Sequence, residues 1–343
     1  MNAVKLGDIC NFYNGGAWSQ NEFTEAGYPV LKVSNCKSNG FEISDVSYIP
    51  YDIAQKSKIN KLQIDDVIIA TVGSHPNLVE SAAGRSCVVT TAVVGFYLNQ
   101  NAVCLRSKDP NVFSQKYLGY LAASAPFKHY IQSRGKGAAN QMRIAISAIK
   151  DFSFVLPDIE VQKAVGTILS AYDDLIENNQ KQIKLLEEAA QRLYKEWFVD
   201  LRFPGHETTP STSFTRIAEA GSILSSVRAP VGRLNITKNK IVIGRGLAAI
   251  NHRSGMQSYL FYLLKERFFK DNIIGNGAIF ASISKDELLG QKFIVPVDDL
   301  VKRFNTVVSD IDGKIAGLEN QIMLLTEARD RLLPKLMSGE IEV

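Results

Sequence analysis

The sequence predicts an α/β protein in which two globular α/β lobes are joined by a pair of long antiparallel coiled-coil-like helices. Two observations lead to this prediction. A helical pattern of 36 residues occurs twice, at 154–189 and at 293–328, with no gap between the copies. Each copy follows a lobe in which strand-like runs and short helices come in the same order, so the chain is an internal repeat of lobe plus helix.

The chain length supports a division into several parts. At 343 residues the chain exceeds the size at which one hydrophobic core usually stops growing. We divide it into a first lobe at 1–157, a long helix at 158–203, a shortened second lobe at 204–296, and a second long helix with a C-terminal tail at 297–343.

The first lobe is expected to contain short strands followed by short helices. Strand-like runs lie at 67–72, 86–98 and 101–106, and a helical run follows at 113–131. A Gly-rich turn at 135–147 then leads to the Phe-x-x-Pro sequence that precedes the first long helix.

The first long helix has an apolar seam whose spacing alternates between three and four residues, as in a coiled coil. Pro157 stands just before the helix, where a missing N–H costs nothing. At about 40 residues and a rise of roughly 1.5 Å per residue, the helix is a rod of about 60 Å that needs a partner to cover its seam. Asn179 is polar where the second copy has Leu318, and we expect it to fix the register of the pair. The seam positions are Leu169, Tyr172, Ile176, Asn179, Ile183, Leu186, Ala190, Leu193 and Trp197.

The second lobe and helix repeat this order over fewer residues. Strand-like runs at 222–227 and 240–250 precede a helical run at 256–273 and a Gly-rich turn at 275–284. About 65 residues precede the first of these runs in lobe one, but only about 20 do so in lobe two, which is therefore expected to lack its opening strands. The second seam is Val308, Ile311, Ile315, Leu318, Ile322, Leu325, Arg329 and Leu332.

Charge is segregated along the chain although its net value is only +4. Residues 1–150 carry a net charge of +5 and residues 204–292 carry +6, whereas 151–203 carry −4 and 293–343 carry −3. Basic lobes on acidic helices indicate that the lobes face a polyanion and that the helices face protein. Two basic modules held at a fixed separation would read a duplex at two places.

The sequence contains no recognisable catalytic or metal-binding motif. It lacks a phosphate-binding G-x-x-x-x-G-K-[ST] loop, a G-x-S-x-G elbow, an H-E-x-x-H helix and the Asn/Asp-Pro-Pro-aromatic loop of adenine methyltransferases. The four cysteines (Cys10, Cys36, Cys87, Cys104) lie far apart, which predicts reduced thiols in the core. No apolar run reaches the roughly 18 residues of a membrane span. We expect a cytoplasmic chain that catalyses nothing alone and binds no cofactor, metal or membrane.

Five stretches of the sequence are similar to one known family. They are spread over nearly the whole length of the chain, and EWFVDLRFPGHE and LPKLMSGEI are the most specific parts of them. On these residues the sequence resembles the specificity (DNA-recognition) subunit of type I restriction-modification enzymes. The stretches are Lys5–Ile9 (KLGDI), Tyr28–Asn35 (YPVLKVSN), Leu193–Glu207 (LYKEWFVDLRFPGHE), Ser226–Ile236 (SVRAPVGRLNI) and Leu332–Val343 (LLPKLMSGEIEV).

The resemblance implies two target-recognition domains, each reading one half of a split site in double-stranded DNA, joined by two antiparallel spacer helices. It also implies two methyltransferase (modification) subunits that dock around the spacers and bring S-adenosylmethionine. Two restriction subunits that use ATP and Mg can join them. The family normally opens its second recognition domain with a counterpart of KLGDI, whereas residues 204–220 stand there in this chain. This departure puts the full reading of the second half-site in question.

Candidate DNA contacts are basic or amide side chains in loop-like settings. Arg can fork onto guanine and Gln onto adenine, whereas Lys more often binds phosphate. For each candidate the alternative is a solvated surface charge, or for Arg228 a structural arginine that binds local carbonyls. The candidates are Lys32, Arg85, Arg134, Lys136, Gln141 and Arg143 in lobe one and Arg228, Arg233 and Arg245 in lobe two.

The sequence therefore predicts a non-catalytic subunit that directs methyltransferase subunits, and restriction subunits where present, to a bipartite DNA site. The alternative is a helical adaptor whose lobes bind protein or an anionic ligand rather than DNA. The two hypotheses differ in salt dependence, because contacts to DNA phosphates release counterions.

Overall fold

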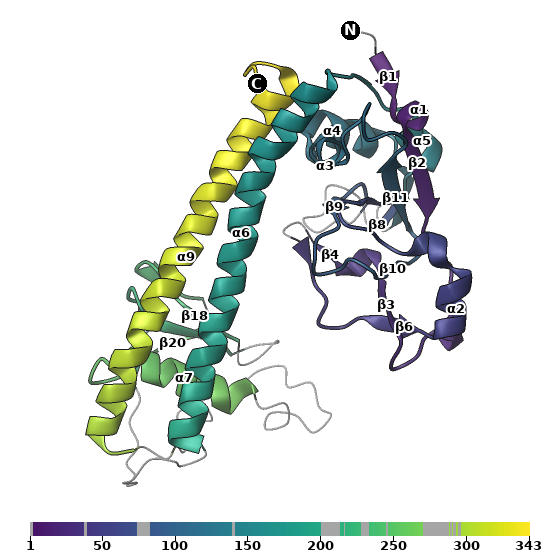
Figure 1. Ribbon diagram of the computed structural model, residues 1–343. Coiled ribbons are helices and arrows are strands. Elements are labelled where there is room, and N and C mark those ends of the chain that lie inside the picture. The colour runs from purple at the N-terminus through teal and green to yellow at the C-terminus, as the bar shows by residue number, and fades with distance from the viewer. Residues whose placement is uncertain are drawn as a thin grey trace. The chain divides into compact units, whose positions relative to one another are not determined.

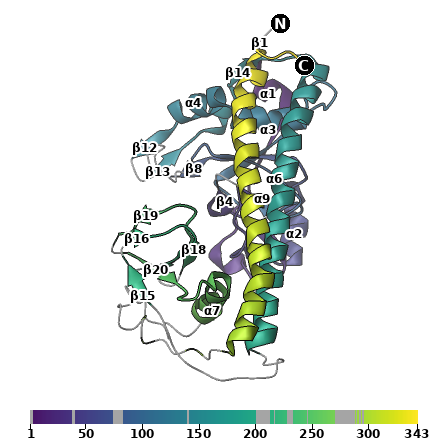
Figure 2. The ribbon, with the colours of Figure 1, turned by 90° about the vertical axis from the view of Figure 1, so that its left-hand side faces the viewer.

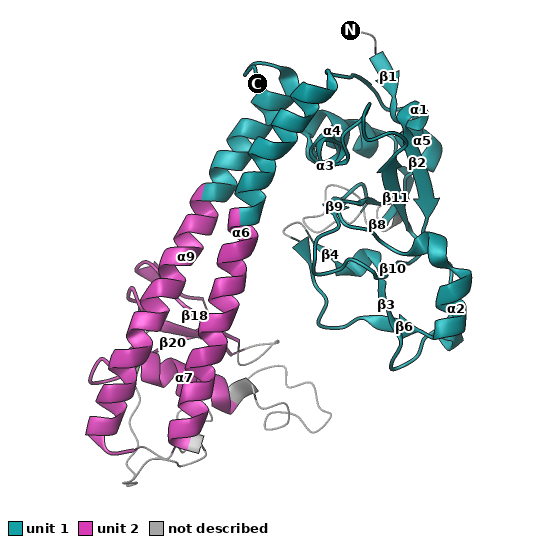
Figure 3. Cartoon of the chain, viewed as in Figure 1, with its two compact units in different colours: residues 1–174, 325–343 teal, residues 175–324 magenta. Residues whose placement is uncertain are grey.

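The computed structural model describes most of the chain in two compact units, which Figure 3 colours separately. Unit 1 comprises residues 1–174 and 325–343, and unit 2 comprises residues 175–324. We call the part of unit 1 before the long helix lobe one, and the part of unit 2 between the two long helices lobe two. The described residues are 3–37, 40–73, 83–138, 141–199, 213–215, 217–227, 233–244, 246–269, 288, 290, 293 and 296–343.

The two predicted long helices are α6 (Ile159–Tyr194) and α9 (Asp298–Ser338), teal and yellow in Figure 1. In unit 1 the start of α6 packs beside the end of α9, where Leu169 and Leu336 share one core. In unit 2 the end of α6 packs beside the start of α9, where Ala190 and Phe304 share another core. The helices therefore run antiparallel in each unit, as predicted, and Figure 2 shows them side by side.

The ends of the long helices follow elementary helix chemistry. Asp298 and Asp299 lie in the first turn of α9, where negative charge suits the helix dipole. At the other end, Gly339 adopts a φ of +73°, the left-handed conformation that commonly closes a helix. α6 continues into a short π-helical turn at Lys195–Val199. In the described part of the chain no helix is long and apolar enough to cross a membrane.

The centre of lobe one is a four-stranded antiparallel sheet with both faces buried. Its order is β2 (Cys10–Asn14), β11 (Ala102–Ser107), β7 (Val67–Ala70) and β9 (Ser86–Val88). Val67 and Leu105 face a core that includes helix α3 (Gln115–Ala123), helix α4 (Ala125–Ser133) and the adjoining parts of α6 and α9. Ile68 and Cys104 face the opposite core. Alternate residues thus pack on opposite faces, which explains the unbroken apolar runs.

Smaller elements surround this sheet in lobe one. β10 (Tyr97–Leu98), β3 (Tyr28–Leu31) and β6 (Ser47–Ile49) form a three-stranded sheet, and β12 (Lys136–Ala138), β13 (Gln141–Arg143) and β8 (Val72–Gly73) form another. β1 (Ala3–Lys5) pairs with β14 (Ser153–Val155), and β4 (Cys36–Lys37) pairs with β5 (Gly40–Phe41). The remaining helices are α1 (Leu6–Ile9), α2 (Tyr51–Lys56), α5 (Ile146–Lys150) and the 3-10 turns Gln20–Glu22, Val33–Asn35 and Lys58–Asn60.

Lobe two contains the same four-stranded sheet. Its order is β15 (Ser213–Thr215), β20 (Leu247–Asn251), β17 (Ile223–Ser226) and β18 (Leu234–Ile236), antiparallel throughout. Helix α7 (Gln257–Phe269) follows β20 as α3 follows β11. A second pair, β16 (Ile217–Ala218) with β19 (Ile241–Val242), completes its described strands.

The expectation that lobe two lacks its opening strands is wrong for the strand that pairs with β20. β15 occupies the sheet position of β2, and Phe214 pairs with Ile250 as Phe12 pairs with Leu105. What lobe two does not repeat is the segment between the first two strands. Lobe one has β3 to β6 and α2 there, whereas only residues 216–222 separate β15 from β17. Short length alone could not show where in the order the residues are missing.

Candidate nucleic-acid interface

Three of the predicted cations come together on one hairpin of lobe one, which we call the basic hairpin (Arg134, Lys136 and Arg143). The sequence predicts a Gly-rich turn here, but residues 136–138 and 141–143 form the paired strands β12 and β13. Lys136 lies opposite Arg143 in the register, and both residues are exposed. Directly opposite residues share one face of a strand pair, so the two cations lie close together. Neither side chain has a hydrogen bond or ion pair with any described residue.

Packing beneath the hairpin holds the face that carries Lys136 and Arg143 toward solvent. Met142 is 3% exposed and belongs to the core of lobe one. A Cβ added at Gly135 would lie 2.3 Å from the Met142 side chain, so a larger residue there would displace that side chain. Arg134 lies at the end of α4 with its guanidinium 4.6 Å from the centre of the Tyr130 ring, a cation–π contact that leaves it exposed. The buried methionine therefore turns Lys136 and Arg143 toward solvent.

The predicted Gln141 begins strand β13 opposite Ala138 in the register. It is two residues from Arg143, so its position belongs to the same side of the strand. Its side chain lies outside the described residues.

Arg85 and Arg233 occupy equivalent positions in the two lobes. Each stands just before the fourth strand of its sheet, and each carbonyl accepts a hydrogen bond from the last residue of the neighbouring strand. These bonds are Ala70 N to Arg85 O at 2.9 Å and Ser226 N to Arg233 O at 2.9 Å. The two arginines were chosen from local sequence only, and the repeated sheet relates them to each other.

The side chains of these two arginines have different surroundings. The Arg85 guanidinium donates a 2.6 Å hydrogen bond to the carbonyl of Cys36, on the small strand β4 that lobe two does not repeat. Arg233 is exposed, and its backbone N–H donates to the Ser226 hydroxyl at 2.9 Å. Arg85 thus has a structural contact inside its lobe, whereas Arg233 is presented to solvent.

Lys32 is also held within lobe one. Its ammonium donates a 2.7 Å hydrogen bond to the Ser47 hydroxyl and lies 4.5 Å from the centre of the Phe23 ring. These contacts make Lys32 a structural residue of the lobe, neither a solvated surface charge nor an open phosphate contact. The other two candidates of lobe two, Arg228 and Arg245, lie outside the described residues.

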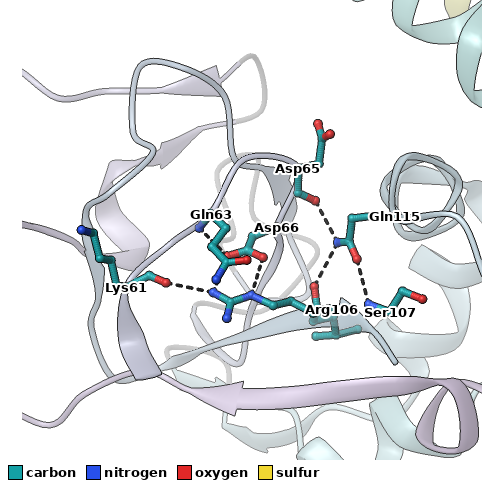
Figure 4. Close-up of polar contacts among 8 residues, drawn as sticks. Lys61, Gln63, Asp65, Asp66, Arg106, Ser107 and Gln115 are labelled. Atoms are coloured by element: carbon teal, nitrogen blue, oxygen red, sulfur yellow. Dashed lines mark hydrogen bonds and ion pairs between the residues drawn. The ribbon is translucent and has the colours of Figure 1, made fainter. Parts of the chain in front are cut away.

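A buried ionic network in lobe one was not predicted from the sequence (Figure 4). The Arg106 guanidinium binds both carboxylate oxygens of Asp66, at 2.6 and 2.7 Å, and the carbonyl of Lys61 at 2.8 Å. These hydrogen bonds with Asp66 raise the pKa of Arg106. The Asp66 side chain is only 3% exposed. Its oxygens are taken up by Arg106 and by the Gln63 N–H, so the network anchors strands rather than offering a binding site.

Gln115 extends this network and has a counterpart in lobe two. Its amide accepts from the Ser107 N–H at 2.8 Å and donates to the carbonyls of Leu105 and Asp65. Gln257 accepts from the His252 N–H at 3.0 Å and donates to the Ile250 carbonyl. In both lobes a glutamine at the start of the helix thus closes the end of the strand before it.

The described cysteines and acidic residues do not suggest metal or redox chemistry. All four cysteines are buried and free, as the sequence predicts. Burial raises the pKa of Cys10 to about 12, which keeps this thiol protonated at neutral pH. Across the described ranges, no group of three or more His, Cys, Asp or Glu side chains is placed to hold a metal ion.

Comparisons with known proteins give a consistent result. The family described as type I restriction modification DNA specificity domain matches residues 1–188 of the 343. A protein of Methanocaldococcus jannaschii that is described as the specificity subunit of type I restriction enzyme MjaX is 24% identical, over 99% of this chain and 93% of the relative. The MjaIX specificity subunit of the same organism is 23% identical, over 66% of this chain and 69% of the relative.

The fold is similar to that of a solved structure over nearly its whole length. The type I restriction-modification S subunit of M. genitalium superposes with a TM-score of 0.61 at 15% sequence identity, covering 98% of this chain and 96% of that one. At that identity the likeness concerns the fold: paired lobes, each with its sheet, and two long helices.

Proposed function

This chain belongs to the type I restriction-modification DNA specificity family, and from that membership we propose how its parts recognise DNA. Members of the family supply the sequence specificity of the enzyme, and as a family they are non-catalytic. The proposal is that lobe one and lobe two each read one half of a split site. The domain boundaries remain those of the sequence prediction, with recognition domains at 1–157 and 204–296.

The observation that supports two readers is the repeated position of Arg85 and Arg233. The same sheet, with the same backbone hydrogen bond at its fourth strand, places an arginine at one equivalent point in each lobe. Both lobes are also basic while the helices are acidic. Two basic lobes built on one repeated sheet suit a duplex, which offers the same phosphate backbone to each lobe.

The basic hairpin is the proposed contact surface of lobe one. Lys136 binds phosphate in this proposal, and Arg143 reaches a base edge in the major groove, where Arg forks onto guanine. Arg134, with its guanidinium already held over Tyr130, supplies a third cation. All three are exposed, and Lys136 and Arg143 have no hydrogen bond or ion pair with a described residue, which leaves these charges available to displace counterions.

We propose further that the helix pair binds two copies of a methyltransferase subunit. Leu185 of α6 and Leu324 of α9 are 139 residues apart, the repeat distance, and are 65% and 53% exposed. Each leucine is an exposed apolar side chain on an acidic helix, where a partner protein could cover it. Their equivalence supports one partner bound twice. In this proposal the partner brings S-adenosylmethionine and methylates adenine. Restriction subunits, where present, bring ATP and Mg. The complex works in the cytoplasm.

The proposal is tested by mapping methylated adenines in DNA from cells that express this chain with its methyltransferase subunit. We expect a split motif with a constant gap. Duplex binding by the purified complex should weaken with salt, with a log–log slope of about −0.9 for each phosphate contact. No observation favours the adaptor alternative, which requires a slope near zero and no sequence-dependent methylation.

A further inference from the structure

A three-way junction in unit 1 connects lobe one to both long helices. Asp173 of α6 accepts a 2.6 Å hydrogen bond from the Tyr120 hydroxyl on α3. Its other carboxylate oxygen accepts from the Arg329 guanidinium of α9 at 2.5 Å. Arg329 also binds the neighbouring Asp330 at 2.8 Å. A single carboxylate therefore ties a helix of the lobe to α6 and α9 at once.

The equivalent junction in unit 2 is built around Asp312, which follows Asp173 by the repeat distance of 139 residues. Asp312 accepts a 2.9 Å hydrogen bond from the Tyr262 hydroxyl on α7, as Asp173 does from Tyr120. The residue that corresponds to Arg329 is Ala190, which is completely buried. No guanidinium can stand at that position, so the ion pair of unit 1 has no counterpart there.

Because no arginine stands beside it, Asp312 keeps one buried carboxylate oxygen, Oδ2, without a hydrogen-bond partner among the described residues. Desolvation by burial raises the pKa of Asp312, although Ser258 and Tyr262 partly oppose the shift by hydrogen bonding and Lys265 by its charge. α6 reaches lobe two by a different contact, the 3.0 Å hydrogen bond from the Gln191 amide to Glu266 on α7. A third contact joins α7 to α9, because the Tyr259 N–H donates a 3.2 Å hydrogen bond to Asn305. Unit 2 thus joins its lobe to the helices by several hydrogen bonds, without the ion pair of unit 1.

The two arrangements differ in how firmly they hold a lobe on its helices. An arginine and a tyrosine on one carboxylate restrict three elements together, and charge-assisted bonds are the stronger ones. In unit 2, hydrogen bonds without an arginine join α7 to the helices, and Tyr259 and Tyr262 also pack in the core around Phe304. The ion pair therefore adds to the junction of unit 1 a directional contact that the equivalent junction of unit 2 lacks.

We propose that Asp173 and Arg329 are positioning residues that set the gap length of the DNA site, by fixing the orientation of lobe one on the helix pair. This inference rests on the proposed reading of a split site. Neither residue touches DNA in this account. Both act by holding lobe one, through Tyr120 of α3, on the helix pair. Removing the ion pair should make the complex accept gaps that the unaltered protein rejects.

The test is methylation of a DNA library in which the two half-sites are separated by gaps from two base pairs shorter to two longer than the mapped one. Arg329→Ala gives unit 1 the residue that the repeat has at Ala190. We expect its complex to methylate sites with a gap one base pair too short or too long roughly fivefold better, relative to the mapped gap, than the unaltered complex does. Arg329→Lys keeps a cation beside Asp173 and should restore the single gap.

Two controls separate this role from general instability. Arg331→Ala removes an exposed ion pair with Glu327 on the same helix and should leave the gap unchanged. Asp173→Asn keeps the shape of the junction and repeats the test if Arg329→Ala impairs assembly. Unchanged gap discrimination in the assembled variants overturns the inference. Loss of methylation at every gap in both variants also overturns it, because the pair would then serve assembly.

The unaltered complex distinguishes the two levels of the proposal. If it methylates no split site, the proposed function fails. If it methylates one gap and the variants keep that gap, only the positioning role of Asp173 and Arg329 fails.

Discussion

Lobe one and lobe two form the same turn before the central strand of the sheet with different chemistry. In lobe one Asp65 has a φ of +64° and precedes Asp66, whose carboxylate binds Arg106. In lobe two Gly221 has a φ of +85° at the same point and precedes Ser222. The Ser222 hydroxyl is buried and has no partner in the described part of the chain.

The difference shows that backbone geometry keeps the turn while the ion pair is optional. Both turns make the same bond, from Asp66 N to Gln63 O at 3.2 Å and from Ser222 N to Glu219 O at 3.0 Å. A buried ion pair adds little net stability over neutral packing, because desolvation cancels most of its attraction. Once one charge is present, however, removing its partner leaves that charge uncompensated. The comparison can therefore be tested with equivalent substitutions in the two lobes.

The largest effect is expected from Asp66→Ala in lobe one. It leaves the Arg106 guanidinium, whose side chain is 18% exposed, without its carboxylate. We expect the free energy of unfolding of lobe one to fall by about 3 kcal/mol. Urea denaturation followed by tryptophan fluorescence measures this, since Trp18 is buried in lobe one. The matched change Ser222→Ala should cost less than about 1 kcal/mol, because its hydroxyl has no described partner. Equal losses would contradict the contrast between the lobes.

The next effect concerns DNA contact rather than stability. Arg134→Ala with Arg143→Ala removes two cations of the basic hairpin and should weaken duplex binding by about 2 kcal/mol, with the loss confined to one half-site. Binding to duplexes altered in one half or the other, measured at several salt concentrations, checks this. Arg331→Ala is the control, since its charge lies on α9. An equal loss at both half-sites would argue against one lobe for each half.

A smaller effect, of opposite sign in the two units, is expected when Asp173 and Asp312 are changed to Asn. Asp173→Asn breaks the ion pair with Arg329 and should destabilise unit 1 by about 1 kcal/mol, since the pair is partly exposed. Asp312→Asn removes a buried carboxylate with one unpartnered oxygen and should leave unit 2 unchanged or slightly more stable at neutral pH. Thermal unfolding of the two variants under identical conditions makes the comparison. A loss of stability in both would mean that Asp312 contributes as much as Asp173.

The pH dependence of Asp312 follows from the direction of its pKa. Burial raises the pKa in the folded state, so the folded protein binds this proton more tightly than the unfolded chain does. The stabilisation is fully present below the unfolded pKa, about 4, and is lost as the pH rises through the higher folded pKa. Stability measured between pH 4 and pH 7 should therefore favour the unaltered protein over Asp312→Asn more at the acid end. If the difference in stability between the two proteins does not change with pH, the pKa of Asp312 is not raised in the folded state.

The smallest effect is expected at the centre of the helix pair. Asn179 is buried and donates a 3.1 Å hydrogen bond to Gln321, whereas the repeat-equivalent Leu318 is buried and apolar. Asn179→Leu should raise the stability of unit 2 by less than about 1 kcal/mol, because an apolar seam residue packs at lower cost than a polar one. Thermal unfolding detects this gain. A clear loss of stability would mean that the Asn179–Gln321 pair contributes more than packing does.

The local sequence pattern predicted which helices and strands form better than it predicted which of them pair with one another. The alternating spacing gave the long helices, because a seam of Leu169, Ile176 and similar residues has only one way to be buried. The residues 135–147 were predicted as a turn because two glycines dominate them, although tertiary pairing with Val72 and Gly73 makes strands there. Sheet order needs contacts that one sequence does not contain, so the position of β15 was missed.

The candidate site was predicted in part for the same reason. Basic residues in loop-like settings led to the basic hairpin and to Arg85 and Arg233, but which of these cations have partners depends on distant residues such as Cys36 and Ser47. The Arg106–Asp66 network joins positions 40 residues apart and leaves no local signal. The 139-residue repeat does pair Asp173 with Asp312 and Arg329 with Ala190, and that alignment could have revealed the junctions.

The most direct test of two readers compares one arginine from each lobe. Methylated adenines are mapped in cells that express the methyltransferase subunit with the unaltered chain, with Arg143→Ala or with Arg233→Ala. We predict a split motif for the unaltered chain, relaxed in one half by Arg143→Ala and in the other half by Arg233→Ala. A continuous motif, or relaxation of the same half by both substitutions, would contradict the assignment of one half-site to each lobe.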